Sequence, residues 1–262
     1  MNFYWIYNIP NWLMFVAIVS TITVITVIAV SYTVKWSKKT MGLYPGENDL
    51  VNVYYSSIGV FYGITLGLIA VGAWNSFTTI SDRTDSEAAA LGAMYRIADN
   101  YQEPTRSELK ADLKDYNYYI INEAWKLQQR GEIPTAGIPK ILKMQKAIST
   151  YEPQTTGQSN LHVAGLRKFD ELTQLSRMRL LNIGSGLPAV LWWVVFSGAG
   201  INIFMLCLLI FRSLRTHILL STLVSVMMGL LISMTIALDH PFRGEVSISS
   251  ASFQNVYDTL MK

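Results

Sequence analysis

The sequence is poor in charged residues and in cysteine, and each shortage excludes a class of protein. Charged residues make up 15% of the chain, against about 25% in average soluble domains, while hydrophobic residues reach 51%. The single cysteine, Cys207, excludes a disulfide framework and a metal cage built from cysteines. The net charge of +3 is small, and no cluster of lysine and arginine offers a binding surface for nucleic acid. These exclusions leave a membrane protein as the expected class.

Signatures of catalysis and cofactor binding are equally scarce. The glycine-containing stretch at residues 184–186 continues into Leu187 and Pro188, which does not match a dinucleotide-binding loop. The three histidines have no metal-ligand spacing: His162, His217 and His240. We therefore expect no enzyme, no cofactor and no metal site.

Four long apolar runs account for the hydrophobic excess. None contains Asp, Glu, Lys or Arg, and each is close to the roughly 20 residues that a helix needs to cross about 30 Å of hydrocarbon. The four runs cover residues 11–34, 51–74, 187–211 and 217–238. They predict an all-α integral membrane protein with four transmembrane helices, and the lipid bilayer as its partner.

The residues between the second and third runs are charged and predict a helical soluble domain inserted there. Leu109, Leu113 and Tyr116 begin a stripe with helical spacing. Thr105 and Glu108 have the spacing of a capping box at the start of this helix. Four domains follow from the pattern: an N-terminal transmembrane hairpin (1–75), the helical soluble insert (76–186), a C-terminal transmembrane hairpin (187–238) and a tail (239–262).

The tail begins with a sharp helix stop and ends with a short amphipathic helix. Pro241 disfavours helical geometry at His240, and Gly244 permits a turn. Apolar residues then recur at helical spacing, at Phe253, Val256, Tyr257 and Leu260. We expect the tail to dock either on the insert or at the membrane interface.

Two of the predicted spans carry a small residue at every fourth position, which lets helices approach closely. One stripe lies in the second span, at Gly59, Gly63 and Gly67, and the other in the fourth, at Ser221, Ser225, Gly229 and Ser233. The stripes suit packing within one chain or packing between subunits, and the sequence leaves both open.

The side of the second span opposite its glycines mixes hydroxyl, amide and bulky apolar groups: Ser57, Phe61, Thr65, Leu68, Gly72 and Asn75. A channel lining uses such a mixture, because hydroxyls replace part of an ion's hydration while apolar side chains narrow the path. An ordinary helix interface would also accept it. No predicted span holds a carboxylate, which excludes a proton relay and leaves a passive pore.

Several segments resemble the bestrophin-like family of four-span membrane proteins. The matching parts are residues 86–99 (SEAAALGAMYRIAD), the DYNYYIINEAW stretch that ends at Trp125, residues 177–193 and, most specifically, residues 238–253 (LDHPFRGEVSISSASF). The last segment carries the family's C-terminal motif at Asp239, Pro241, Phe242 and Gly244. One departure is Ala124, which separates a glutamate and a tryptophan that tend to be adjacent in the family.

The resemblance implies the plan of bestrophins, which are pentameric anion channels whose second span lines a hydrophobic neck. By that analogy, copies of this chain form a homo-oligomer, a pentamer, that conducts chloride or other inorganic ions in the bacterial inner (cell) membrane. Arg177 and Arg179 would concentrate anions at the pore mouth. The alternative is a non-conducting sensor or scaffold whose insert binds a ligand or protein partner.

Two arguments give opposite orientations in the membrane. The short loops carry five basic residues: Lys35, Lys38, Lys39, Arg212 and Arg215. The positive-inside rule places these loops in the cytoplasm, which puts the insert outside. The resemblance to bestrophins implies that the insert is cytoplasmic, so both orientations stay open.

Overall fold

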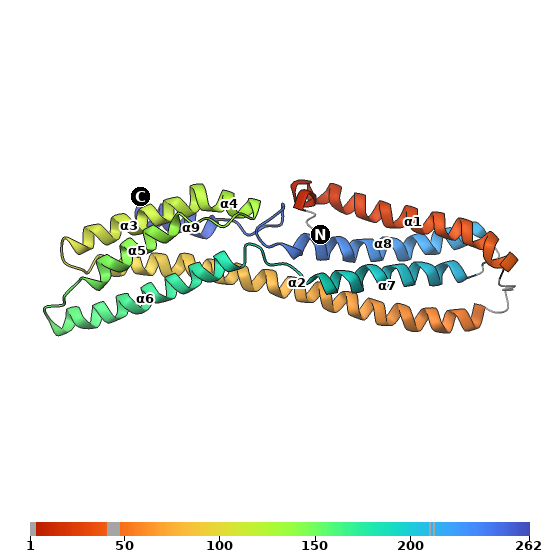
Figure 1. Cartoon of the computed structure of the whole chain (residues 1–262), viewed down its shortest axis with the longest axis horizontal. Coiled ribbons are helices and arrows are strands. Elements are labelled where there is room, and N and C mark those ends of the chain that lie inside the picture. Colours follow the sequence, from red (N-terminus) through yellow and green to blue (C-terminus); the bar gives the residue numbers. More distant parts are fainter. Residues whose placement is uncertain (1–3, 41–47, 210, 212) are drawn as a thin grey trace. The chain divides into compact units, whose positions relative to one another are not determined.

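The computed structural model describes residues 4–40, 48–209, 211 and 213–262, and these residues form helices and loops without a strand. The chain divides into two compact units. Unit 1 comprises Met1–Ser76 and Gly186–Asp239, and unit 2 comprises Phe77–Ser185 and His240–Lys262. One helix, α2 (Asn48–Ala98), contributes residues to both units (Figure 1).

Unit 1 is built from long apolar helices. Besides the first part of α2, they are α1 (Asn11–Thr40), α7 (Ala189–Leu208) and α8 (Leu214–Asp239), with a short 3-10 helix, η1 (Tyr4–Asn8), before α1. All four long helices are long and apolar enough to cross a membrane. The prediction of an all-α integral membrane protein with four transmembrane helices is therefore confirmed (Figure 1).

The small residues of α8 pack against α1. A Cβ atom built on Gly229 would lie 3.0 Å from the Cα atom of Val19, so glycine permits the close approach of the two backbones. The serines of the same stripe, Ser221, Ser225 and Ser233, are fully buried. The α8 stripe therefore packs within the chain.

A second contact joins α2 to α7. The hydroxyl of Tyr62 donates a hydrogen bond to the carbonyl oxygen of Val195 at 3.2 Å, and its ring lies against Gly198. Nearby, Leu66 and Ile69 of α2 are buried in the apolar core of unit 1. One side of α2 is thus committed to this core.

Unit 2 is an assembly of helices around an apolar core. After α2, its elements are α3 (Thr105–Tyr119), a π-helical turn η3 (Ile120–Ala124), α4 (Trp125–Arg130), α5 (Gly137–Ser149), α6 (Thr156–Leu181), α9 (Ala251–Val256) and a second π-helical turn η4 (Tyr257–Met261). The stripe expected from the sequence lies in this core, since Leu109, Leu113 and Tyr116 are fully buried. Helix α3 packs against α5 (Figure 1).

The capping box predicted at Thr105 and Glu108 is wrong. Helix α3 has Pro104 at its N-cap, so Thr105 already lies in the first turn, and no side chain makes the cap bond. Instead, the carboxylate of Glu103 accepts a hydrogen bond from the backbone N–H of Ser107 at 3.3 Å. Hydrogen bonding to Ser107 lowers the pKa of Glu103 below its usual value.

The tail docks in the core of unit 2, which is one of the two places expected for it. Phe242 and Phe253 are buried, with ring centres 6.0 and 5.8 Å from the ring of Trp125. The indole N–H of Trp125 donates to the carbonyl oxygen of Ile248 at 3.2 Å. Gly244 makes the turn between these contacts, with a φ of 84° that favours glycine.

Candidate functional site

The candidate site is the exposed face of α2 in unit 1. Of the six residues predicted to line a pore, Thr65 is partly buried and the other five are exposed. The largest are Phe61, which is 72% exposed, and Leu68, which is 67% exposed. Because the other side of α2 is buried in the core, this face is left for lipid, water or a second protein chain.

The hydroxyl groups on this face are bonded within their own helix. Ser57 donates to the carbonyl oxygen of Val53 at 3.0 Å, and Thr65 donates to that of Phe61 at 2.8 Å. The bonds use the hydroxyl hydrogens and leave oxygen lone pairs outward. A cation or water can use these lone pairs directly, whereas an anion requires the hydrogen to turn away from the carbonyl.

The glycines of α2 behave differently from the small residues of α8. A Cβ atom built on Gly59 would lie 3.8 Å from the amide oxygen of Asn202 in α7. At Gly63 and Gly67, no described atom lies within 4 Å of such a Cβ atom. The middle of this stripe is therefore open in the single chain and has room for another helix.

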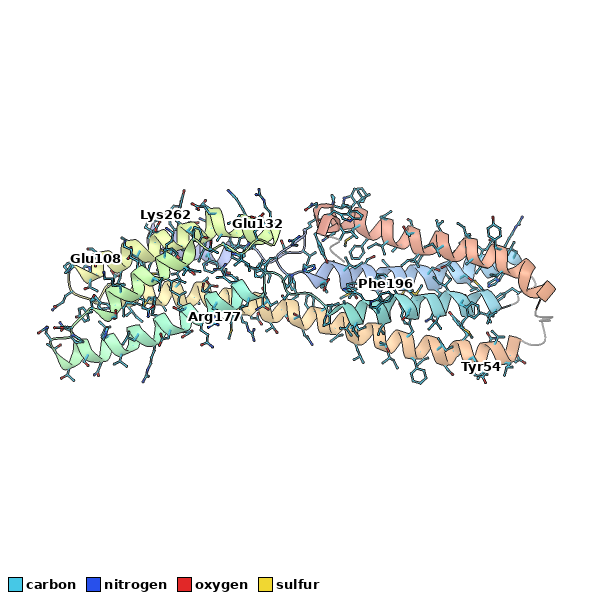
Figure 2. The ribbon with its side chains drawn as sticks, viewed as in Figure 1. Tyr54, Glu108, Glu132, Arg177, Phe196 and Lys262 are labelled. Atoms are coloured by element: carbon cyan, nitrogen blue, oxygen red, sulfur yellow. The ribbon has the colours of Figure 1, made fainter. Side chains whose placement is uncertain are left out.

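The two arginines predicted at a pore mouth have different surroundings. Arg177 is exposed on α6 (Figure 2). Arg179 is buried in unit 2 and forms a bidentate ion pair with the buried Glu87, with Nε–Oε2 at 2.7 Å and Nη2–Oε1 at 3.0 Å. This pairing corrects the expectation for Arg179, because its charge is matched inside the core and is not available to concentrate ions.

The Glu87–Arg179 pair belongs to a buried polar network. The Tyr116 hydroxyl lies 2.7 Å from the hydroxyl of Ser176 and donates to Oε1 of Glu87 at 3.5 Å. Burial alone would lower the pKa of Arg179, but the charge and hydrogen bonds of Glu87 raise the pKa above its usual value. The guanidinium also lies 5.7 Å from the ring centre of Trp125. The ion pair therefore joins α2 to α6 within unit 2.

Each histidine has a hydrogen-bond partner. His162 Nδ1 lies 3.2 Å from the Tyr101 hydroxyl, and His240 Nδ1 lies 3.1 Å from the carbonyl oxygen of Ser185. His217 Nε2 bonds the carbonyl oxygen of Leu206 at 3.0 Å. Within the described part of the chain, no three His, Cys, Asp or Glu side chains come together as metal ligands.

Comparison with known families decides the classification. The model of the bestrophin-like domain matches residues 13–253. The chain belongs to the bestrophin-like family. No curated protein matched it.

The bestrophin-like fold is also seen in solved structures. A crystal structure of a bacterial bestrophin homologue from Klebsiella pneumoniae, carrying one substitution, matches with 14% identity and a TM-score of 0.72 over 93% of this chain and 99% of that chain. A second structure of the homologue, determined by Zn-SAD phasing, matches with 13% identity and a TM-score of 0.68 over 92% and 96% of the two chains. At this level of identity the likeness establishes the shared fold.

The C-terminal motif of this bestrophin-like chain has structural contacts in both units. In unit 1, the carboxylate of Asp239 accepts a hydrogen bond from the backbone N–H of Leu187 at 2.5 Å, just before α7. In unit 2, the carbonyl oxygen of Pro241 accepts from the N–H of Ile248 at 2.9 Å, and Phe242 is buried.

Of the basic residues in the short loops, Arg215 is exposed. The side chains of Lys35, Lys38 and Lys39, and Arg212, lie outside the described residues.

Proposed function

We propose that this bestrophin-like chain assembles with copies of itself into a channel for inorganic ions, lined by the exposed face of α2. The observation that carries the proposal is the division of α2 into a buried side and an exposed side of mixed chemistry. Membership of the family supports the same arrangement, with a pentamer as the proposed assembly and the bacterial inner membrane as its location. The four apolar helices anchor each copy in the bilayer.

The exposed face has the composition of a pore wall. Ser57 and Thr65 supply hydroxyl groups, while Phe61 and Leu68 supply large apolar side chains that extend from the helix. Rings of such apolar groups narrow a path and control it by dewetting, so we propose Phe61 as the main constriction. Gly63 and Gly67 provide room for a helix of the neighbouring copy, because no described atom of this chain fills it.

Anions are the proposed cargo. The exposed Arg177 would raise the local concentration of anions, and Arg179 makes no contribution because Glu87 matches its charge. The intrahelical hydroxyl bonds of Ser57 and Thr65 are a barrier to anion solvation that rotation of the hydroxyl removes. Selectivity therefore depends on the hydroxyl orientation in the assembled pore.

Reconstitution of the purified full chain into planar bilayers tests the proposal. We expect ionic current whose reversal potential in a potassium chloride gradient lies toward the value for chloride. The Phe61→Ala variant should raise the leak current, while Val60→Ala, which changes an exposed residue on a different face of α2, should leave it unchanged. A pure oligomer that passes no current in any salt gradient would contradict the channel and favour a non-conducting sensor or scaffold.

A further inference from the structure

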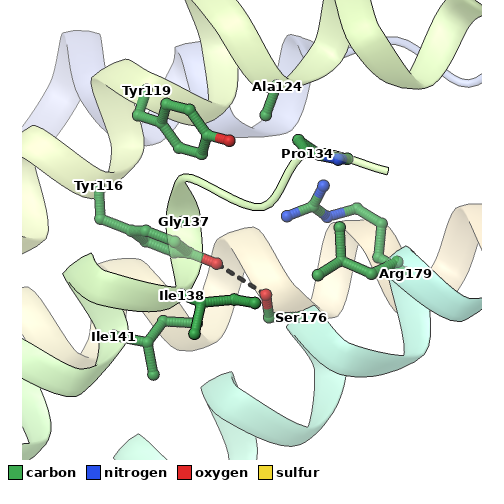
Figure 3. Close-up of a pocket in the computed structure, with 10 residues that line it drawn as sticks. Tyr116, Tyr119, Ala124, Pro134, Gly137, Ile138, Ile141, Ser176 and Arg179 are labelled. Carbon is green, nitrogen blue, oxygen red and sulfur yellow. Dashed lines mark hydrogen bonds between the residues drawn. The ribbon is translucent and has the colours of Figure 1, made fainter. Parts of the chain in front are cut away.

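A small cavity lies in unit 2 between α3, α5 and α6. Its volume is about 20 Å³, which is enough for one water-sized particle. Most of its wall is apolar, including Ala124, Ile138, Ile141 and Leu180. Polar groups are therefore few, and their hydrogen bonding can be accounted for individually (Figure 3).

Two hydrogen-bond donors of the wall have no acceptor. They are the Nη1 atom of Arg179 and the hydroxyl of Tyr119, and both side chains belong to residues that are only 4% exposed. Figure 3 shows the guanidinium of Arg179 and the hydroxyl of Tyr119 turned toward the same space. A buried donor without an acceptor is costly, so two of them facing one cavity indicate a missing group.

The neighbouring protein groups do not supply the acceptor. Both oxygens of Glu87 bind the opposite edge of the Arg179 guanidinium, through Nε and Nη2. The Tyr116 hydroxyl is engaged with Ser176 and Glu87 and also interacts with the Arg179 guanidinium, yet Nη1 keeps no partner. The missing group must therefore be a ligand or a solvent molecule.

The N-terminus of α5 favours negative charge in the cavity. Helix α5 begins at Gly137, which lines the cavity, so the positive end of its dipole faces this space. Burial raises the pKa of Tyr119, while the backbone N–H groups of Gly137 and Ala136 oppose that change. The hydroxyl is thus kept protonated, as a hydrogen-bond donor.

We propose that this cavity binds one monatomic anion of the halide class, held by Nη1 of Arg179 and the hydroxyl of Tyr119. An anion accepts from both donors at once, and the N-terminus of α5 stabilises its charge. A water molecule that accepted the same two bonds would turn its own hydrogens toward apolar side chains. The site does not depend on the proposed pore.

The bound halide would join three elements of unit 2. Tyr119 ends α3, Arg179 lies in the last turn of α6, and the cavity wall includes the start of α5. A ligand that binds only the folded state raises the unfolding temperature. Halide concentration should therefore set the stability of unit 2.

Crystals of the full chain grown with bromide in place of chloride test the site directly. We expect an anomalous bromide peak between Arg179 and Tyr119. An ordered water without anomalous signal at that position, or an empty cavity in bromide, would overturn the proposal.

A solution measurement gives an independent test. The purified full chain is melted in chloride and in gluconate at equal ionic strength, and we expect a higher midpoint in chloride. Tyr119→Phe removes one donor and should weaken the apparent chloride affinity roughly tenfold or more. Tyr118→Phe, at a half-exposed neighbour on the same helix, should keep the chloride response. Equal chloride responses in the wild type and Tyr119→Phe would contradict the site.

Discussion

The two units satisfy their buried polar groups in different ways. In unit 1, the hydroxyls of Ser225 and Ser233 each donate to the carbonyl oxygen four residues earlier in the same helix, at 2.7 Å. In unit 2, Arg179 pairs with Glu87 from a separate helix. Local bonds suit a membrane segment because lipid offers no other partner, whereas long-range polar bonds specify how the helices of unit 2 pack.

The difference predicts that the two units respond to different kinds of substitution. A polar deletion in unit 2 leaves its partner buried and unmatched, which is costly. Unit 1 has few such links but packs α1 on α8 through small residues. Added volume should therefore damage unit 1, and lost polar groups should damage unit 2.

The largest effect is expected from Glu87→Ala in unit 2. The substitution leaves the Arg179 charge buried without its partner, which typically costs about 3–5 kcal/mol of stability. Thermal unfolding of the full chain in detergent measures the change. Glu171→Ala is the matched control, because its pair with Lys168 is on the surface and should contribute little. Equal losses in the two variants would contradict the special role of the buried pair.

The next effect is expected from Gly229→Ala in unit 1. The added methyl would lie 3.0 Å from the Val19 backbone, so α1 and α8 must separate, at a cost of about 1–3 kcal/mol. Gly63→Ala adds the same group where no described atom is near and should not reduce the stability of the single chain. If the α2 stripe packs between copies, Gly63→Ala should instead weaken the oligomer, which size-exclusion chromatography measures.

A smaller effect is expected from Trp125→Phe. The ring contacts with Phe242 and Phe253 are largely kept, but the hydrogen bond to the Ile248 carbonyl is lost, at about 1 kcal/mol. Limited proteolysis should then release the tail more readily. Trp193→Phe, at a residue that is 75% exposed, is the control. Unchanged tail protection in Trp125→Phe would show that this bond does not hold the tail.

The smallest effect concerns alkaline pH and Tyr101 in unit 2. Burial, and then the charge of Tyr151, raise the pKa of Tyr101 from 10 to about 12. Below pH 10 the tyrosine is protonated in both folded and unfolded chains, so its contribution to stability is complete there. As the pH rises from 10 to 12, the unfolded chain releases the proton first, and this contribution is lost. Tyr101→Phe should therefore reduce the fall in unfolding temperature between pH 10 and pH 12. A fall as steep as that of the wild type would show that Tyr101 does not cause this pH dependence.

The membrane helices could be predicted from the sequence because length and apolarity are local properties. The continuation of α2 beyond the second apolar run is also a local property. Apolar residues recur there at helical spacing, for example Ala88 and Leu91, and both are buried. By contrast, Glu87 and Arg179 are far apart in the chain, so no local sequence pattern predicts their pairing. A signal was present, since Glu87 lies on the helix face that also carries Leu91 and Met94, where a charge requires a partner.

The small-residue stripes show the limit of such patterns. From spacing alone, the stripes of α2 and α8 predict the same kind of close helix packing. In the structure, a Cβ atom built on Gly229 would contact the backbone of Val19, whereas one built on Gly63 would have no described atom within 4 Å. The difference arises from tertiary packing. For the same reason, the exposure of Phe61 shows that its side chain lies outside the apolar core of unit 1, but it does not identify the residue that Phe61 contacts in an oligomer.

The position of the tail has a consequence for biosynthesis. Phe242 and Phe253 complete the core around Trp125, yet the ribosome makes them after α8. Translation of residues 77–185 therefore ends long before their hydrophobic core can close. Helices α7 and α8 are made during that interval, and Trp125 lacks its aromatic neighbours until Phe242 follows α8. A stalled ribosome would leave this surface open to chaperones and quality-control proteases.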